Sequence, residues 1–194
     1  MGKFNSLILF VFLLVAVIFT ASCKSGYTQN VNEKYLITDY KFDSLIANDD
    51  TNIVILYTSW CNGSKETINN FYSEVLDSIK SKGIENRIIL LLADDNVDTS
   101  IINKHRARGF LAYCIPGSGN SAIENRSAIK DFISNEFPNQ EINWLGFGFK
   151  IPVELLISKD GKILNSADEL LPFKYCSERF LGLKIGKIES NVIK

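Results

Sequence analysis

One cysteine lies where the pattern of the sequence changes from strand to helix. Residues 60–65 read Trp-Cys-Asn-Gly-Ser-Lys; an apolar run, residues 53–57, precedes them, and apolar residues at helical spacing follow. This order predicts a strand, a short turn and a helix that begins at or just after Cys61. Backbone N–H groups without partners and the positive end of the helix dipole meet at such a start. Both favour a thiolate, the form of cysteine that attacks disulfides, so the stretch predicts thiol–disulfide chemistry.

The hexapeptide resembles the active site of the thioredoxin superfamily, in which Trp-Cys-x-x-Cys-Lys lies between a strand and a helix. Here Ser64 replaces the second cysteine. A second stretch, residues 150–164, resembles the proline-led strand and hairpin of the same family. The resemblance places Pro152 where the family has the cis-proline that faces the active cysteine. It covers roughly residues 35–185, and the ending resembles the membrane-anchored, extracytoplasmic branch of thioredoxins.

The resemblance implies an α/β fold, a thioredoxin-like three-layer sandwich. Its central mixed sheet would have four or five strands flanked by helices, with an insertion between the third strand and the cis-proline strand. The local patterns agree: Ile88 to Ala93 is apolar throughout, as in a parallel strand buried on both faces. Asp160-Gly161 between two apolar runs predicts a hairpin. Helices are expected over residues 64–80 and 121–137, a short first strand at 35–37, and a last helix containing Phe180.

The resemblance also assigns roles at the site. Cys61 would be the attacking thiol, while Trp60, Ile151 and Pro152 would bind the substrate. Ser64 can donate a hydrogen bond to the sulfur of Cys61. It cannot resolve a mixed disulfide, because that step needs a second thiol.

Two further thiols could supply that step, Cys114 and Cys176. Parallel strands end at the usual ligand edge of an open α/β sheet, and both cysteines are expected near that edge. Either could resolve the mixed disulfide on Cys61, or the two could pair with each other. Buried free thiols are the third alternative, since cysteine packs well as a small hydrophobic residue. An external thiol could also act as the reductant.

The acids and the histidine are expected to have smaller roles. The position six residues before Cys61, where typical thioredoxins carry a buried carboxylate, holds Ile55. Glu154, two residues after the proline, is either a substitute for that acid or an ordinary strand residue. Asp94 and His105 are expected to be solvated. No cluster of metal ligands is evident and no cofactor is implied, while a net charge of −1 without a basic block argues against a nucleic-acid partner.

The N-terminal segment reads as a targeting signal. Lys3 precedes an apolar run, residues 7–19, and small residues lead to Cys23. This pattern resembles a bacterial lipoprotein signal, in which the cysteine is lipidated. The expected divisions are a signal peptide at 1–22, a lipidated tether at 23–34 and a thioredoxin-like domain at 35–194. An ordinary cleaved signal and an uncleaved anchor remain alternatives, and each of them places the domain outside the cytoplasm, in a bacterial cell envelope.

Two functions are therefore predicted. The first is a lipid-anchored monothiol reductase or isomerase that acts through Cys61 on disulfides of exported proteins or peptides. The second is a redox-silent binding module that holds a peptide or protein partner at the cell envelope. The reach of Cys114 or Cys176 towards Cys61 would separate the two.

Overall fold

The computed structural model describes residues 32–47, 51–83, 87–94, 99–116, 121–140, 142 and 148–167. They belong to one compact unit, Val31–Lys194. The predictions for the signal, Cys23, Cys176 and the last helix lie outside the described residues. No helix within the described ranges is long and apolar enough to cross a membrane.

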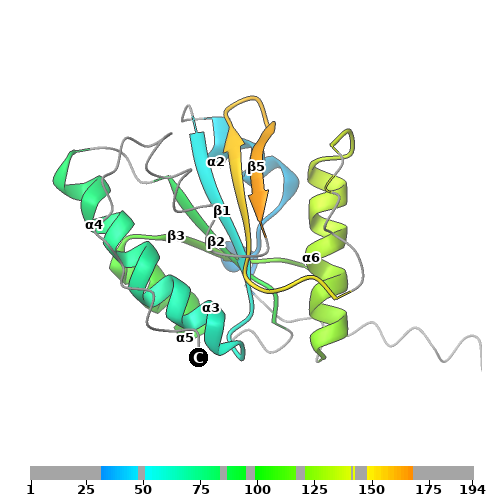
Figure 1. Cartoon of the computed structure of the whole chain (residues 1–194), viewed down its shortest axis with the longest axis horizontal. Helices are drawn as coiled ribbons and strands as arrows, with labels where there is room; N and C mark the ends of the chain where they lie inside the picture. Colours follow the sequence, from blue (N-terminus) through cyan, green and yellow to red (C-terminus); the bar gives the residue numbers. More distant parts are fainter. Residues whose placement is uncertain are drawn as a thin grey trace, which may run out of the picture. The chain divides into compact units, whose positions relative to one another are not determined.

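A five-stranded mixed sheet forms the centre of the fold (Figure 1). The strand order is β3-β2-β1-β4-β5. The first three strands are parallel to one another, β4 pairs antiparallel with β1, and β5 pairs antiparallel with β4. The strands are β1 (Thr51–Tyr57), β2 (Ile88–Leu92), β3 (Leu111–Cys114), β4 (Val153–Ser158) and β5 (Ile163–Ala167). The predicted α/β class with a mixed sheet of four or five strands is confirmed.

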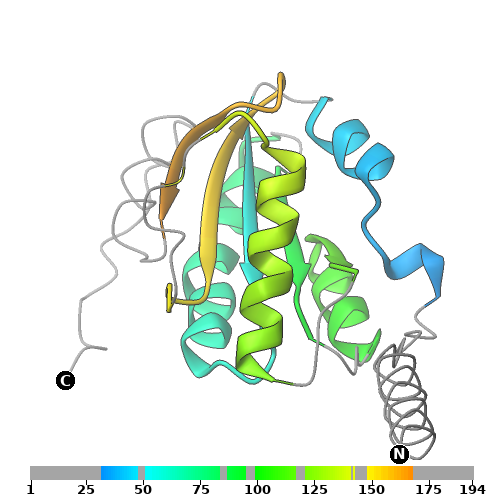
Figure 2. The same ribbon diagram turned by 90° about the vertical axis from the view of Figure 1, so that its right-hand side faces the viewer.

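Helices cover both faces of the sheet (Figure 2). The central strands β1 and β2 are therefore buried on both sides, which explains why their sequences are apolar throughout. The helical stretch 62–81 and α5 (Thr99–Arg108) pack on one face. On the other face lie α2 (Asp39–Ala47) and α6 (Ala122–Glu136). The rings of Phe42 and Phe132 join α2 to α6, edge to face, with 5.3 Å between their centroids.

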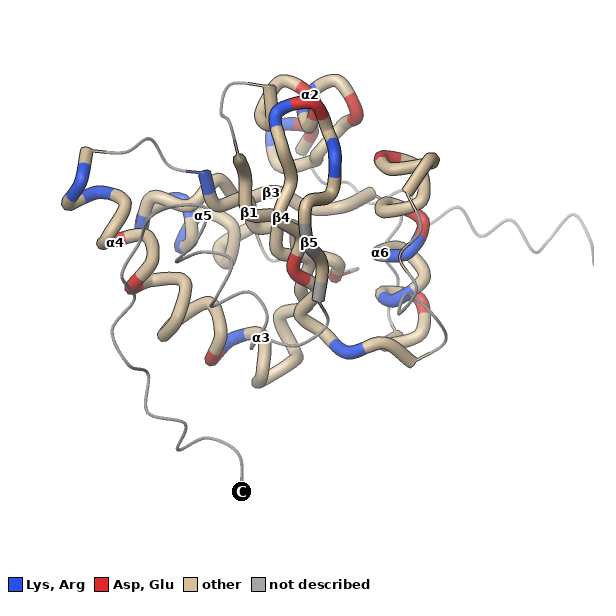
Figure 3. Tube along the Cα trace, turned by 45° about the horizontal axis from the view of Figure 1, so that its top comes forward, with Lys and Arg blue, Asp and Glu red and all other residues tan. Residues whose placement is uncertain are grey.

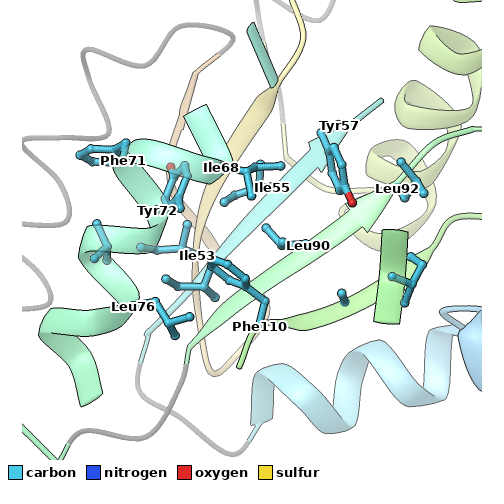
Figure 4. Close-up of a cluster of buried hydrophobic side chains, with 14 of the residues drawn as sticks. Ile53, Ile55, Tyr57, Ile68, Phe71, Tyr72, Leu76, Leu90, Leu92 and Phe110 are labelled. Carbon is cyan, nitrogen blue, oxygen red and sulfur yellow. The ribbon is translucent and has the colours of Figure 1, made fainter. Parts of the chain in front are cut away.

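The helix after Cys61 contains a wider turn. It consists of α3 (Asn62–Glu66), the π-helical segment η2 (Thr67–Tyr72) and α4 (Ser73–Ser81). Its inner side points Ile68 and Tyr72 at Ile53 and Ile55 of β1 (Figure 4). The hydroxyl of Ser73 donates to the carbonyl oxygen of Ile68 at 3.0 Å, which satisfies one backbone acceptor within the wider turn.

Arg108, at the end of α5, supports the same segment from outside. Its guanidinium donates to the side-chain oxygen of Asn69 at 2.7 Å and also bonds the hydroxyl of Ser73. The helix that follows Cys61 is thereby tied to α5 at its wider turn. π-Helical turns are frequent at functional sites, and this one lies between Cys61 and α4.

One part of the prediction was wrong in detail. Residues 35–37 do not form a strand: the chain makes a short 3₁₀ helix, η1 (Glu33–Tyr35), and one bridge between Leu36 and Cys114. In the region of the expected insertion, between β2 and β4, lie the edge strand β3 and the helices α5 and α6. Arg106 covers that edge, since its guanidinium lies 4.9 Å from the ring centroid of Tyr113 and its Nε donates to Ala112.

The predicted hairpin is confirmed, with Gly161 at φ 73° in the turn between β4 and β5. Gln140, just after α6, holds this hairpin: its side-chain nitrogen donates to Gly161 at 3.0 Å, and its oxygen accepts the N–H of Ile163 at 2.6 Å. Lys, Arg, Asp and Glu are spread over most of the helices, whereas the charged residues of α5 are all basic (Figure 3).

Candidate active site

Cys61 caps the N-terminus of the active-site helix. The chain leaves β1 at Tyr57, turns, and enters α3 at Asn62, so that Cys61 has extended backbone angles, φ −80° and ψ 114°. The first helical bond runs from Lys65 N to the carbonyl oxygen of Cys61, at 3.1 Å. The side chain of Cys61 is half-buried.

The sulfur faces the proline strand and makes no bond to the helix N–H groups. The thiol of Cys61 donates to the carbonyl oxygen of Ile151 at 3.6 Å, and no cap hydrogen bond forms. The expected convergence of backbone donors on the sulfur was therefore wrong in this structure. The peptide bond between Ile151 and Pro152 is cis, as predicted. Both residues are half-buried, so the structure brings Cys61, Ile151 and Pro152 together from segments 90 residues apart.

Ser64 lies one turn after Cys61, on the inner side of the helix. Its side chain is fully buried, and its hydroxyl has no hydrogen-bond partner among the described residues. The predicted bond from this hydroxyl to the sulfur of Cys61 is thus absent. The hydroxyl points into the core because Ser64 shares a helical stripe with Ile68 and Tyr72, four and eight residues further on.

Trp60 is the exposed member of the site, with 49% of its surface accessible. An exposed aromatic side chain directly before Cys61 could contact a peptide that binds there. Trp144 and Phe147, two aromatic residues that precede the proline strand in the sequence, lie outside the described residues. Phe149, in contrast, is buried in the core beside α6, and Arg126 of α6 donates to its carbonyl oxygen at 3.1 Å.

Cys114 is a buried free thiol at the end of β3. Burial raises the pKa of this thiol to about 11, so that it stays protonated at neutral pH. In the sheet, Cys114 pairs with Leu92, and Leu92 pairs with Tyr57, which places Cys114 two strands away from the end of β1. Two strand spacings, roughly 10 Å, therefore separate Cys114 from Tyr57, and Cys61 lies four residues further along the chain. These features match the third alternative, a packed free thiol.

Asp94 is buried, and the expectation of a solvated strand end was wrong. Only 7% of its surface is exposed, and both carboxylate oxygens accept the N–H of Ser59, at 3.1 and 3.0 Å. Burial raises the pKa of Asp94, while the bonds from Ser59 and the charge of Lys65 lower it again. The sequence signal that could have indicated a buried carboxylate is the position of Asp94 directly after the fully apolar run 88–93.

His105 is also buried rather than solvated. Its ring packs edge to face on Tyr57 and on Phe110, with centroids 5.7 and 6.0 Å apart. Burial, together with the charges of Arg108 and Lys104, lowers the pKa of His105 to about 4. The ring is therefore neutral at pH 7 and serves as a core aromatic, because α5 turns this one position of its basic stretch towards the sheet.

Glu154 is the most deeply buried acid of the described chain. It is fully buried in β4, and burial raises its pKa to about 8, whereas the hydroxyl of Tyr72 lowers that pKa by a smaller amount. Neither carboxyl oxygen has a hydrogen bond of regular geometry. Its cross-strand neighbour is Ile55, the position where the resemblance expected a carboxylate. Cross-strand neighbours lie on the same face of a sheet, so the carboxyl of Glu154 lies on the same face as the side chain of Ile55, where the resemblance expected a carboxylate.

The described residues do not contain a group of three or more side chains that could hold a metal ion. The site is instead a single accessible thiol between a helix start and the strand that begins after a cis-proline. Such an arrangement can form one disulfide with a substrate held beside the proline strand. It offers no second thiol from its own motif.

Comparison with known proteins gives similarity of fold only. No protein-family model matches the chain, and no curated protein matches it at a significant level. Among solved structures, the chain is similar to the C-terminal domain of a protein from Bacteroides thetaiotaomicron that is described as a thiol-disulfide oxidoreductase. The TM-score is 0.41 and the identity 20%, and the match covers 69% of this chain and 78% of the other.

Two further structures are similar to the same extent. One is the pneumococcal exposed lipoprotein thioredoxin of Streptococcus pneumoniae, at 9% identity and a TM-score of 0.42, covering 69% of this chain and 85% of that one. The other is a thiol:disulfide interchange protein of a Bacteroides species, at 13% identity and a TM-score of 0.42, covering 77% and 83%. The fold class rests on the sheet order and the helices described above.

Proposed function

We propose that this chain acts on disulfides of exported proteins or peptides through a single active-site cysteine, Cys61, in the manner of a monothiol reductase or isomerase. One observation carries the proposal. The half-buried thiol of Cys61 lies 3.6 Å from the carbonyl oxygen of Ile151, beside the cis peptide bond to Pro152. A substrate strand that pairs with the backbone at Ile151 would bring its own sulfur to that of Cys61.

The first step is thiol–disulfide exchange. The thiolate of Cys61 attacks one sulfur of the substrate disulfide, and a new S–S bond forms as the old one breaks. The leaving sulfur takes the electron pair as a thiolate and is protonated from solvent. The product is a mixed disulfide on Cys61, and the protein and the substrate each hold one of its sulfurs.

The second step needs a thiol from elsewhere. Ser64 carries a hydroxyl, and burial keeps Cys114 protonated with a pKa of about 11. For reduction, an external thiol, as its thiolate, would attack the sulfur of Cys61, so that an S–S bond to Cys61 forms and the substrate leaves as a thiolate; a second external thiol would then form the external disulfide and release Cys61 with the electron pair. For isomerisation, another cysteine of the substrate would attack the substrate sulfur, which releases Cys61 and leaves the substrate with a rearranged disulfide. Cys176 remains a third source of the resolving thiol.

The proposal includes the location of the protein. Residues 1–22 would be a signal peptide, Cys23 a lipidated first residue of the mature chain, and residues 23–34 the tether to the domain 35–194. The support is the apolar run of residues 7–19 followed by small residues and a cysteine. A cell-envelope position would supply the oxidising surroundings in which substrate disulfides persist.

The test is to trap the mixed disulfide. The full chain is mixed with a disulfide-bonded peptide at neutral pH, quenched with acid, and analysed by mass spectrometry after digestion. We expect the peptide on Cys61, no adduct in Cys61→Ala, and an undiminished adduct in Cys114→Ala, the matched control for loss of a thiol. An adduct that appears only under denaturing conditions would contradict the proposal.

The second candidate is a redox-silent module that binds a peptide or protein partner. The observation that favours it is that the second motif position, Ser64, carries a fully buried hydroxyl and no thiol. Under this alternative, Cys61→Ala binds a reduced peptide as tightly as the wild type, and the wild type traps no disulfide. The same trapping experiment therefore decides between the two functions.

A further inference from the structure

The hydrogen-bond ladder between β1 and β2 ends in a side chain. Ala93 N donates to the carbonyl oxygen of Tyr57 at 2.8 Å, as a parallel ladder requires. The next donor on the β1 side is the N–H of Ser59, which a continued ladder would direct to the carbonyl of Ala93. Both carboxylate oxygens of Asp94 accept that N–H, at 3.1 and 3.0 Å. The chain therefore leaves the sheet at Ser59, two residues before Cys61.

The surroundings of Asp94 suit this role. The side chain is buried and points to the face of the sheet on which α3 lies, because Asp94 follows Leu92 by two residues. The charge of Lys65, in the first turns of the active-site helix, acts favourably on the carboxylate. A hydrogen bond from a backbone N–H to a carboxylate is roughly twice as strong as one to a neutral acceptor. Asp94 thus links the end of β1 with the start of the helix.

We propose that Asp94 is a positioning residue for the reaction of Cys61, an inference that rests on the function proposed above. Its carboxylate fixes the beginning of the turn 58–61 through Ser59. The end of that turn is fixed by the contact of Cys61 with Ile151 and by the helical bond from Lys65. With both ends held, the sulfur keeps its place beside the proline strand, where the substrate disulfide must arrive in line with it.

Two variants of Asp94 remove the carboxylate acceptor of the Ser59 N–H to different extents. Asp94→Asn keeps one oxygen acceptor and removes the charge, whereas Asp94→Ala removes both acceptors. Asp77→Asn, at an exposed position of α4, is the matched control for the same chemical change. If Asp94→Ala does not fold, Asp94→Asn carries every measurement below.

The first measurement is amide hydrogen exchange at Ser59 in the full chain, followed by NMR or by mass spectrometry with fragmentation. We expect exchange about tenfold faster, or more, in Asp94→Ala, with Asp94→Asn intermediate and Asp77→Asn unchanged, because exchange reports local opening of the bonded N–H. Exchange at Ser59 that is unchanged in Asp94→Asn, and in Asp94→Ala where it folds, would overturn the anchoring itself. This readout does not depend on any activity.

The second measurement compares two reactions of Cys61. Trapping of a disulfide-bonded peptide needs the sulfur aligned beside the proline strand, whereas alkylation by iodoacetamide needs only an accessible thiolate. We expect trapping to fall about tenfold in Asp94→Asn with alkylation within about twofold of the wild type, because misplacement of a reacting group costs rate steeply. A parallel fall in both reactions, or no fall in trapping, would overturn the positioning role. A wild-type chain that traps nothing would instead overturn the proposed function, and the role of Asp94 in it.

Discussion

Replacing Glu154 with Gln should make the stability of the protein less dependent on pH. The carboxyl of Glu154 is fully buried, and burial raises its pKa from 4.5 to about 8. Between these two values the folded protein holds a proton that the unfolded chain releases. Stability is therefore greatest at low pH as far as Glu154 is concerned, and it falls as the pH rises towards 8. A neutral amide of the same shape removes this dependence.

The magnitude follows from the shift of the pKa. Each unit of difference corresponds to about 1.4 kcal/mol, so a group that moves from 4.5 to about 8 carries on the order of 5 kcal/mol at alkaline pH. Most of that change, roughly 3–4 kcal/mol, falls between pH 5 and pH 8. These are upper values, since the buried site can relax or admit water when the carboxyl ionises.

Urea unfolding at pH 5, 6, 7 and 8 measures the effect, as the difference in free energy of unfolding between Glu154→Gln and wild type. The difference cancels the contributions of the other titrating groups. Burial and the neighbouring Asp39 raise the pKa of Glu136 to about 7. The contribution of Glu136 to the stability of the protein therefore also falls as the pH rises over part of the same range. The lowered pKa of His105 acts in the opposite direction, because stability rises with pH between about 4 and 6.5. Glu66→Gln, on the exposed side of α3, is the matched control.

The expected result is a difference that grows with pH in favour of Glu154→Gln, and no growth for Glu66→Gln. A difference that stays flat from pH 5 to pH 8 would refute the reasoning. It would mean that Glu154 ionises in the folded protein near its ordinary pKa, through solvent that reaches β4. A difference that shrinks with pH would mean that the ionised form is the stabilised one.

The remaining predictions concern the second motif position and the anchor. Ser64→Cys should shorten the lifetime of a mixed disulfide on Cys61 by about tenfold or more, because it restores a thiol one helical turn away, and quenched time points measure it. An unchanged lifetime would show that the inward side chain at this position cannot turn to the sulfur. Mass spectrometry of membrane-extracted protein should find a diacylglyceryl group on Cys23 as the first residue; a different, unmodified N-terminus, with Cys23→Ala still bound to the membrane, would contradict lipidation.

Local patterns in the sequence were enough to predict β1, the helix after Cys61 and the hairpin of β4 and β5. The apolar run 53–57, the helix spacing after Cys61 and the Asp160-Gly161 turn each depend on residues close in the chain, and each predicted element is present. The resemblance added Pro152 opposite Cys61, which no local pattern could supply. The edge strand β3 was missed because four residues, Leu111–Cys114, are too few for a period to be recognised.

Burial of polar side chains was decided only by the tertiary structure. Asp94 and Glu154 look like ordinary polar residues of a strand end and a strand, but Asp94 accepts from Ser59, 35 residues away, and Glu154 pairs with Ile55 of β1. His105 lies in a basic stretch, and only the packing of α5 on Tyr57 turns it inward. Desolvation, which sets the pKa of such groups, is a property of all the neighbours together. The sequence by itself therefore determined which residue could react, and the packing of distant segments decided which groups hold it.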